Sequence, residues 1–342
     1  MRDLSGPLRL AHRARRLVAA QPHIIDLAAS MNPIELAQLV FLAALWGGSF
    51  LFIRVGVTDL GVAPLMALRV GIGALFLLLV LFSRRSPREA LGALRERAWP
   101  LLVVGFFNSA APFCLFAWAE LTLSAGVTSV INATTPLFGA IVAYFWLKDR
   151  LSGLRVAGLV IGFLGVLALV WDQIVTHAGD GASTTSTLLA AGAALTASAL
   201  YGVAASYTKR HLTGVDPLTV AAGTMTAATL ILTPFAIATW PHAAVSMHAW
   251  GATLGLGVAC TGLAYLLFFR LIAAIGPART ITVTFVIPVF GILWGALFLG
   301  EHVSIGMVEA CVAILCGTAL ATGFIKRLPG MGAREHRASA KH

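Results

Sequence analysis

Residues 125–151, AGVTSVINATTPLFGAIVAYFWLKDRL, decide the fold of this chain. The first 23 of them contain no ionisable side chain except a tyrosine, and a lysine, an aspartate and an arginine then follow together at 148–150. A helix rises about 1.5 Å per residue, so such a segment is long enough to cross a hydrocarbon core of about 30 Å. The stretch is therefore predicted to be a transmembrane helix that ends in a charged stop.

A proline and several polar residues interrupt the middle of this segment. Pro136 removes a backbone hydrogen bond, and Asn132, Thr135 and Gly139 lie on the same helical face. A break at membrane depth is tolerated where the freed groups face protein or a water-filled cavity. Pro136 is thus predicted to mark a helix break at the membrane midplane, the alternative being an ordinary kink stabilised by packing. Asn132 is predicted to face a cavity or another helix.

The same pattern returns 152 residues later, in residues 277–303, PARTITVTFVIPVFGILWGALFLGEHV. The motif PLFG at 136–139 aligns with PVFG at 288–291, and Asp149 aligns with Glu301. A match at one fixed offset indicates an internal duplication. The second copy adds two candidate site residues, Pro288 as a second midplane break and Thr284 at the position equivalent to Asn132.

Composition places the whole chain in the membrane class. Hydrophobic residues make up 58% of it and charged residues 11%, against about 45–50% and about 25% in soluble domains. Successive apolar stretches predict an all-α polytopic membrane protein of ten transmembrane helices. These spans are expected at 34–56, 64–82, 100–120, 125–147, 152–171, 187–207, 217–239, 250–272, 277–299 and 304–325.

The basic residues indicate topology. With the N-terminus inside, 22 of the 24 lysine and arginine residues fall in inner segments and none in an outer loop, as the positive-inside rule requires. Both termini are therefore predicted to be cytoplasmic; that the membrane is a bacterial inner membrane is implied by the resemblance given below. The net charge of +10 is explained by this asymmetry, and no nucleic-acid partner is expected.

The four cysteines have no metal-ligand spacing, so neither a metal nor a cofactor is expected.

Five spans in each half imply that the second half enters the membrane from the opposite side. Such an inverted-topology repeat is typical of secondary transporters whose site lies between the halves. Five regions are predicted: an N-terminal extension at 1–33, with Met31 as the expected natural start, a first repeat at 34–171, an outer linker at 172–186, a second repeat at 187–325 and a basic tail at 326–342.

Several motifs occur in a family-like order, namely WGGSF at 46–50, PLFG at 136–139, KDRL at 148–151 and GxxxGxxG at 158–165. Together they resemble the EamA-type branch of the drug/metabolite transporter superfamily over residues 32–325. The resemblance implies an inner-membrane carrier, often an exporter of amino acids, other metabolites or toxic compounds, with a central cavity lined by both halves. It also implies an arginine in the second span, where Arg69 lies.

Aromatic and hydrogen-bonding residues of several spans form a predicted substrate cavity. Taken singly, each is more often a helix-packing residue, and the cavity is credible only as a set. The predicted cavity residues are Trp46, Ser49, Asn108, Asn132, Ser198, Tyr201, Thr261, Tyr265 and Thr284.

Charged residues within or beside the spans are candidates for a gate or for proton coupling. The alternative is a structural role, with Arg69 paired to Glu120 or Glu309 across helices and Glu35 solvated at a helix end. These candidates are Glu35, Arg69, Glu120 and Glu309.

These features predict a secondary-active transporter of a small organic solute, working by alternating access. The chain has no P-loop GxxxxGK[ST], so a gradient must supply the energy, and protons are a candidate coupling ion. No catalytic motif lies within a span, so the chain is not expected to be an enzyme. A channel or a membrane scaffold is the first alternative, and an intramembrane enzyme is the second.

With no cation expected at a span centre, the solute is predicted to be neutral, zwitterionic or amphiphilic. The lipid bilayer is the other expected partner, and no oligomeric state is indicated.

Overall fold

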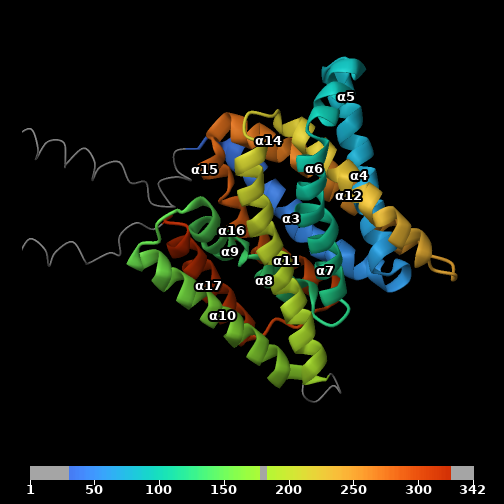
Figure 1. Ribbon diagram of the computed structural model, residues 1–342. Coiled ribbons are helices and arrows are strands. Elements are labelled where there is room, and N and C mark those ends of the chain that lie inside the picture. The colour runs from blue at the N-terminus through green and yellow to red at the C-terminus, as the bar shows by residue number, and fades with distance from the viewer. Residues whose placement is uncertain (1–30, 178–182, 325–342) are drawn as a thin grey trace, which may run out of the picture.

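The computed structural model describes residues 31–177 and 183–324 (Figure 1). The predicted extension up to residue 30, positions 178–182 of the predicted linker and the predicted tail at 326–342 lie outside the described residues. Within the described ranges the regular structure is entirely helical and no strand occurs. The all-α fold class is therefore confirmed.

Ten helical segments make up the described residues up to 177. They are α3 (Pro33–Leu60), α4 (Val62–Arg84), α5 (Pro87–Glu96), α6 (Ala98–Gly105), the π-helical η1 (Phe106–Ala110), α7 (Ala111–Ala119), α8 (Ala125–Asn132), α9 (Thr135–Val142), the π-helical η2 (Ala143–Leu147) and α10 (Gly153–His177).

The described residues from 183 onward form eight more. They are α11 (Thr184–His211), α12 (Pro217–Ala238), α13 (Met247–Leu254), the π-helical η3 (Gly255–Leu263), α14 (Ala264–Ile275), α15 (Pro277–Thr280), α16 (Val283–Leu299) and α17 (Ile305–Ala321).

Local sequence explains where successive helices begin and end. Asn32 accepts a hydrogen bond from the N–H of Ile34 at the start of α3, while Glu35 accepts one from the N–H of Asn32, which is a capping box. Gly61 and Gly276 have φ of +73° and +82° and join consecutive helices without a longer loop. Tight reversals of this kind place consecutive helices next to each other.

Among the described residues, eight helical stretches are long and apolar enough to cross a membrane. The last two apolar helices, α16 and α17, have 17 residues each. α16 is short because the chain turns at Ile281 and Thr282, which separates it from α15. The count of ten spans therefore stays a prediction.

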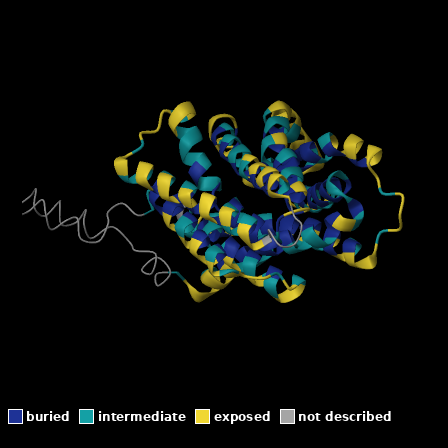
Figure 2. Cartoon of the chain, turned by 90° about the horizontal axis from the view of Figure 1, so that it is seen from below, coloured by how far each residue is buried: buried dark blue, intermediate teal, exposed yellow. Residues whose placement is uncertain are grey.

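Helices from distant parts of the sequence pair with one another. α4 packs along α12, and α10 runs beside α17 at the edge of the bundle (Figure 1). Small residues make the second pairing close, because a Cβ added at Gly158 would lie 2.7 Å from the carbonyl oxygen of Gly317. Exposed residues cover the outer faces of the helices (Figure 2), and many are large and apolar, for example Leu79, Leu167 and Ile237. Such a surface fits contact with lipid.

Three clusters of buried apolar residues meet around two aromatic side chains. Tyr201 of α11 packs against the cluster that includes Leu65 and Met225, and also against the cluster that includes Val130 and Ile314. Trp46 of α3 lies between the second of these clusters and a third. The junction of the clusters is where the cavity described next is found.

Candidate functional site

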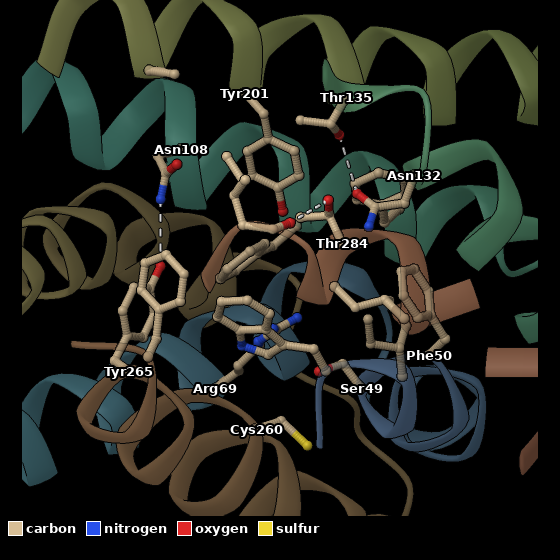
Figure 3. Close-up of a pocket in the computed structure, with 18 residues that line it drawn as sticks. Ser49, Phe50, Arg69, Asn108, Asn132, Thr135, Tyr201, Cys260, Tyr265 and Thr284 are labelled. Atoms are coloured by element: carbon tan, nitrogen blue, oxygen red, sulfur yellow. Dashed lines mark hydrogen bonds between the residues drawn. The ribbon is translucent and has the colours of Figure 1, made fainter. Parts of the chain in front are cut away.

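A cavity of about 360 Å³ lies at the centre of the bundle (Figure 3). Residues on its walls come from two parts of the chain, positions 46–135 and positions 201–287. Asn108 and Tyr201 approach it from one side, and Arg69, Ser49 and Cys260 approach it from the opposite side (Figure 3). A volume of this size suits a small organic molecule.

Seven of the nine predicted cavity residues line this one space. Ser198 and Thr261 do not. The seven are Trp46, Ser49, Asn108, Asn132, Tyr201, Tyr265 and Thr284.

Ser198 and Thr261 are buried in helix contacts instead. The hydroxyl of Ser198 lies 3.2 Å from the carbonyl oxygen of Ala194 and 3.4 Å from that of Ile131. Thr261 donates to the carbonyl oxygen of Leu256 at 2.8 Å. For these two residues the structure agrees with the helix-packing alternative, since both hydroxyl groups donate hydrogen bonds to backbone carbonyl oxygens.

The break in the first duplicated segment places two polar residues in the cavity. α8 ends at Asn132, and α9 begins at Thr135 with Pro136 in its first turn. Thr135 Oγ1 donates to Asn132 Oδ1 at 3.4 Å. The predicted break at Pro136 is therefore present, and it turns an amide and a hydroxyl toward the cavity (Figure 3).

The second duplicated segment differs. Pro288 lies inside α16, and the helix is interrupted earlier, at Ile281 and Thr282. The prediction of a break at Pro288 is wrong, because the missing proline N–H interrupts only one bond of a helix that continues on both sides. Thr284 still faces the cavity, from the first turn of α16.

Two π-helical segments, η1 and η3, shape the cavity walls. No pattern in the sequence indicates them. Asn108 belongs to η1 and Cys260 to η3, and these positions are 152 residues apart, the offset of the duplication. Asn108 Nδ2 lies 3.5 Å from the hydroxyl of Tyr265, which follows η3. π-Helical turns are frequent at functional sites. Hydrophobic periodicity does not reveal π-helical turns here, because one wider turn inside a mostly apolar segment does not change its mostly apolar pattern.

Aromatic rings cover much of the cavity wall. The rings of Trp46 and Phe268 have centroids 5.2 Å apart, and those of Phe116 and Tyr201 are 6.0 Å apart. Phe50 joins Phe116 in an edge-to-face pair at 6.0 Å. Such rings hold an apolar or aromatic body through packing.

Arg69 lines the cavity and is 7% exposed. Its Nε lies 3.3 Å from Thr261 Oγ1, and its Cζ lies 3.8 Å from the centre of the Phe113 ring. The expected pair with Glu120 or Glu309 is absent from the described part of the chain, where one salt bridge occurs, between Arg97 and Glu96 on the surface. Arg69 therefore brings a cation to the cavity wall, which the expected neutral, zwitterionic or amphiphilic solute did not take into account, because hydropathy does not reveal which helical face an arginine occupies.

The three candidate glutamates lie outside the cavity. Glu35 belongs to the capping box of α3, and Glu309 is exposed on α17 beside Trp171 of α10. Glu120 is fully buried, and among the described residues neither of its carboxyl oxygens has a hydrogen-bond partner. Its backbone oxygen accepts a hydrogen bond from Arg54. Of the three, Glu120 alone is a buried ionisable group.

Comparisons with known proteins agree on a family. The EamA-like transporter family model matches residues 35–171 and again residues 188–323. The chain is 23% identical over 286 residues to the uncharacterized transporter YoaV of Bacillus subtilis, covering 83% of this chain and 95% of that protein. It is 26% identical over 267 residues to a protein of Streptantibioticus cattleyicolor named a probable terminal-alkyne amino-acid exporter, covering 77% and 84%. A solved crystal structure with 21% identity superposes with a TM-score of 0.61 over 85% of this chain and 98% of the other, which supports the fold.

Proposed function

Because the chain belongs to the EamA-like transporter family, we propose that it is a secondary-active carrier that exports small organic metabolites by alternating access. Amino acids, related compounds and amphiphilic drugs are the proposed substrates. The observation that carries this proposal is the central cavity, whose walls come from both matched parts of the chain. A relative named as an exporter of an amino acid supports the same substrate range.

Two inverted repeats of five spans, at 34–171 and 187–325, are the architecture that we propose for this carrier. Reciprocal packing supports it. A Cβ added at Gly47 of α3 would lie 2.9 Å from the N atom of Gly291 in α16, and one added at Gly202 of α11 would lie 2.9 Å from the N atom of Gly139 in α9. Each proposed repeat thus packs the first of its helices against the Pro-x-Phe-Gly segment of the other, as a two-fold relation between halves requires.

We propose that a contact between the two repeats closes one end of the cavity. The carboxylate of Glu301 accepts hydrogen bonds from the N–H groups of Ala125 at 2.7 Å and Gly126 at 3.0 Å, at the start of α8. With both termini cytoplasmic in a bacterial inner membrane, this end is the outer one. The state described is then closed to the outside, as one of the two states of an alternating-access carrier must be.

Protons are the proposed coupling ion, and Glu120 is the proposed carrier of the proton. Its buried carboxyl group has no bound donor among the described residues, so its surroundings must change if it is to release a proton. Glu35 and Glu309 are less suited, since one caps a helix and the other is exposed.

The test is exchange of labelled solutes by the purified protein in proteoliposomes, using a panel of amino acids and amphiphilic compounds. We expect saturable exchange. Asn132→Ala should lower it about two- to tenfold, the effect of one lost hydrogen bond, whereas Thr233→Ala, on the exposed face of α12, should not. Glu120→Gln should abolish uptake driven by a proton gradient and leave exchange intact.

Other outcomes would contradict these assignments. A flux that rises linearly with solute concentration would indicate a channel. Full gradient-driven uptake by Glu120→Gln would exclude Glu120 as the proton carrier. Exchange unaffected by Asn132→Ala would remove Asn132 from the binding site.

A further inference from the structure

The guanidinium group of Arg69 is almost entirely buried, yet most of its donors are unused. A guanidinium has five N–H donors in a fixed planar fork. Within the described residues a single hydrogen bond uses one of them, from Nε to Thr261 Oγ1. Phe113 covers one face of the group. The two terminal nitrogens therefore remain available on the side of the cavity (Figure 3).

The cavity supplies no negative charge to this cation. None of the residues that line it is an aspartate or a glutamate, and no carboxylate lies within ion-pair distance of Arg69 in the described ranges. A buried charge without a partner costs free energy unless an opposite charge or strong hydrogen bonds compensate it. The buried carboxyl group of Glu120 acts on Arg69 only from beyond ion-pair distance, so the side of the guanidinium that faces the cavity is left for an anion that enters from outside.

A second unused group lies beside Arg69. Ser49 Oγ is buried in the cavity wall, where the weakly hydrogen-bonding thiol of Cys260 lies beside it and no hydrogen bond of ordinary geometry forms among the described residues. Both Ser49 and Arg69 lie next to Cys260 (Figure 3). A hydroxyl and a guanidinium fork on one wall form a site with several donors for one planar anion.

Aromatic rings make up much of the rest of the wall, among them those of Phe116, Tyr201 and Phe268. The polar residues on the side away from Arg69, for example Asn108 and Asn132, are uncharged (Figure 3). A multiply charged anion would leave charge against these rings without partners, whereas an anion with a single charged end would not. A carboxylate matches the guanidinium fork through two parallel hydrogen bonds.

We propose that Arg69, assisted by Ser49, binds the carboxylate of the transported solute, and that this solute is a monocarboxylate with an apolar body. The inference rests on the proposed carrier function and narrows its substrate class. Amino acids and simple organic acids share the chemistry that Arg69 recognises, and the experiment below separates them.

The test uses one apolar body with different end groups: phenylalanine, hydrocinnamate, phenylalaninamide and phenethylamine. Exchange in proteoliposomes and the Kd from ligand-dependent thermal stabilisation are both measured. We expect exchange of the compounds with a free carboxylate and not of the amide or the amine. Arg69→Gln should raise the Kd of the carboxylates about 10- to 100-fold, which is the effect of a lost charged hydrogen-bond pair.

Two further variants separate binding from folding. Arg54→Gln removes the arginine of α3, which does not line the cavity, and should leave the carboxylate Kd unchanged within about twofold. Arg69→Lys keeps the charge but loses the planar fork, and it should bind carboxylates more weakly than the wild type and more tightly than Arg69→Gln.

Each outcome decides the inference. Exchange of both hydrocinnamate and phenylalanine, or of phenylalanine alone, supports it, and the second result shows that an ammonium group is recognised as well. Exchange of the amide or the amine at the rate of the acids, or an unchanged Kd in Arg69→Gln, overturns the inference and leaves the carrier function in place. Exchange of none of the four, with exchange of another solute of the panel, overturns the inference alone, and exchange of no solute of the panel overturns the carrier function as well.

Discussion

Asp149 and Glu301 occupy equivalent positions after the two proline-containing segments, but their surroundings differ. Glu301 binds the two N–H groups at the start of α8. Asp149 is exposed, and its carboxylate makes no hydrogen bond within the part of the chain that the structure describes. The start of α15, which corresponds to the start of α8, is Pro277, a residue without an N–H to donate. The comparison teaches that two acidic residues at equivalent positions need not make equivalent contacts. Whether such a carboxylate forms hydrogen bonds also depends on the N–H donors at the start of the helix that it faces.

The first prediction removes the contact that only one copy makes. Glu301→Ala should open the end of the cavity at α8, because a carboxylate bound to two backbone donors at a helix start contributes about 1.5–3 kcal/mol. The measurement is labelling of Asn132→Cys by an impermeant maleimide outside intact cells, in a protein whose four native cysteines are replaced by alanine. The rate should rise about tenfold or more.

Asp149→Ala is the matched control for this experiment and should leave the labelling rate unchanged. Equal increases in the two variants would show that Asp149 and Glu301 act alike. No increase in either variant would show that Glu301 does not hold this end closed.

The second prediction tests whether the two reciprocal helix contacts are equally tight. A Cβ added at Gly47 would lie 2.6 Å from Phe290 Cβ, and one added at Gly202 would lie 2.9 Å from the backbone of Phe138. Gly47→Ala and Gly202→Ala should each destabilise the protein by about 1–3 kcal/mol, because neither backbone contact can relax easily. Thermal unfolding in detergent measures this effect.

Gly192→Ala on α11 is the control, since nothing lies within 4 Å of the added Cβ. It should keep or raise the midpoint, as alanine favours a helix over glycine. Destabilisation by Gly47→Ala alone would show that the two contacts are not equivalent.

The smallest expected effect concerns the two prolines. Pro288→Ala should stabilise the protein by about 0.5–1.5 kcal/mol, because it supplies a missing N–H inside α16. Pro136→Ala should change stability by less than about 0.5 kcal/mol, since Pro136 lies in the first turn of α9, where an N–H has no helical partner. The same unfolding assay measures both, and a larger effect at Pro136 would reverse the assignment of the two sites.

Much of this arrangement could be predicted from the sequence. The apolar stretches predict the helical fold. The duplication predicts equivalent site positions at Asn132 and Thr284, and both residues line one cavity. Ser198 and Tyr201 show where such reasoning ends. Both lie on α11 one turn apart, yet the first turns its hydroxyl to a backbone carbonyl while the second enters the cavity. Helical spacing cannot separate them, because the direction of a small hydroxyl depends on nearby acceptors.

The partner of Arg69 differs from the expected carboxylate for a related physical reason. The cost of a buried charge predicted a carboxylate partner in the protein, and the structure gives it a hydroxyl and an aromatic ring. The identity of the compensating group depends on tertiary packing. Sequence reasoning also cannot anticipate a partner that arrives from outside the chain.

The π-helical segments η1 and η3 have a consequence for how this cavity could change during evolution. Each wide turn accommodates an additional residue within a continuing helix. Because the wide turn absorbs that residue, deleting one residue there would restore the ordinary winding and leave both flanks of the helix facing the same way, whereas a deletion in a regular turn would rotate one flank by about 100°. On the η3 side, such a single-codon deletion would reshape the wall around Cys260 while Tyr265 and Phe268, on the flank after η3, stayed at the cavity. The cavity wall could therefore change locally in one evolutionary step, with the residues of both flanks kept in place.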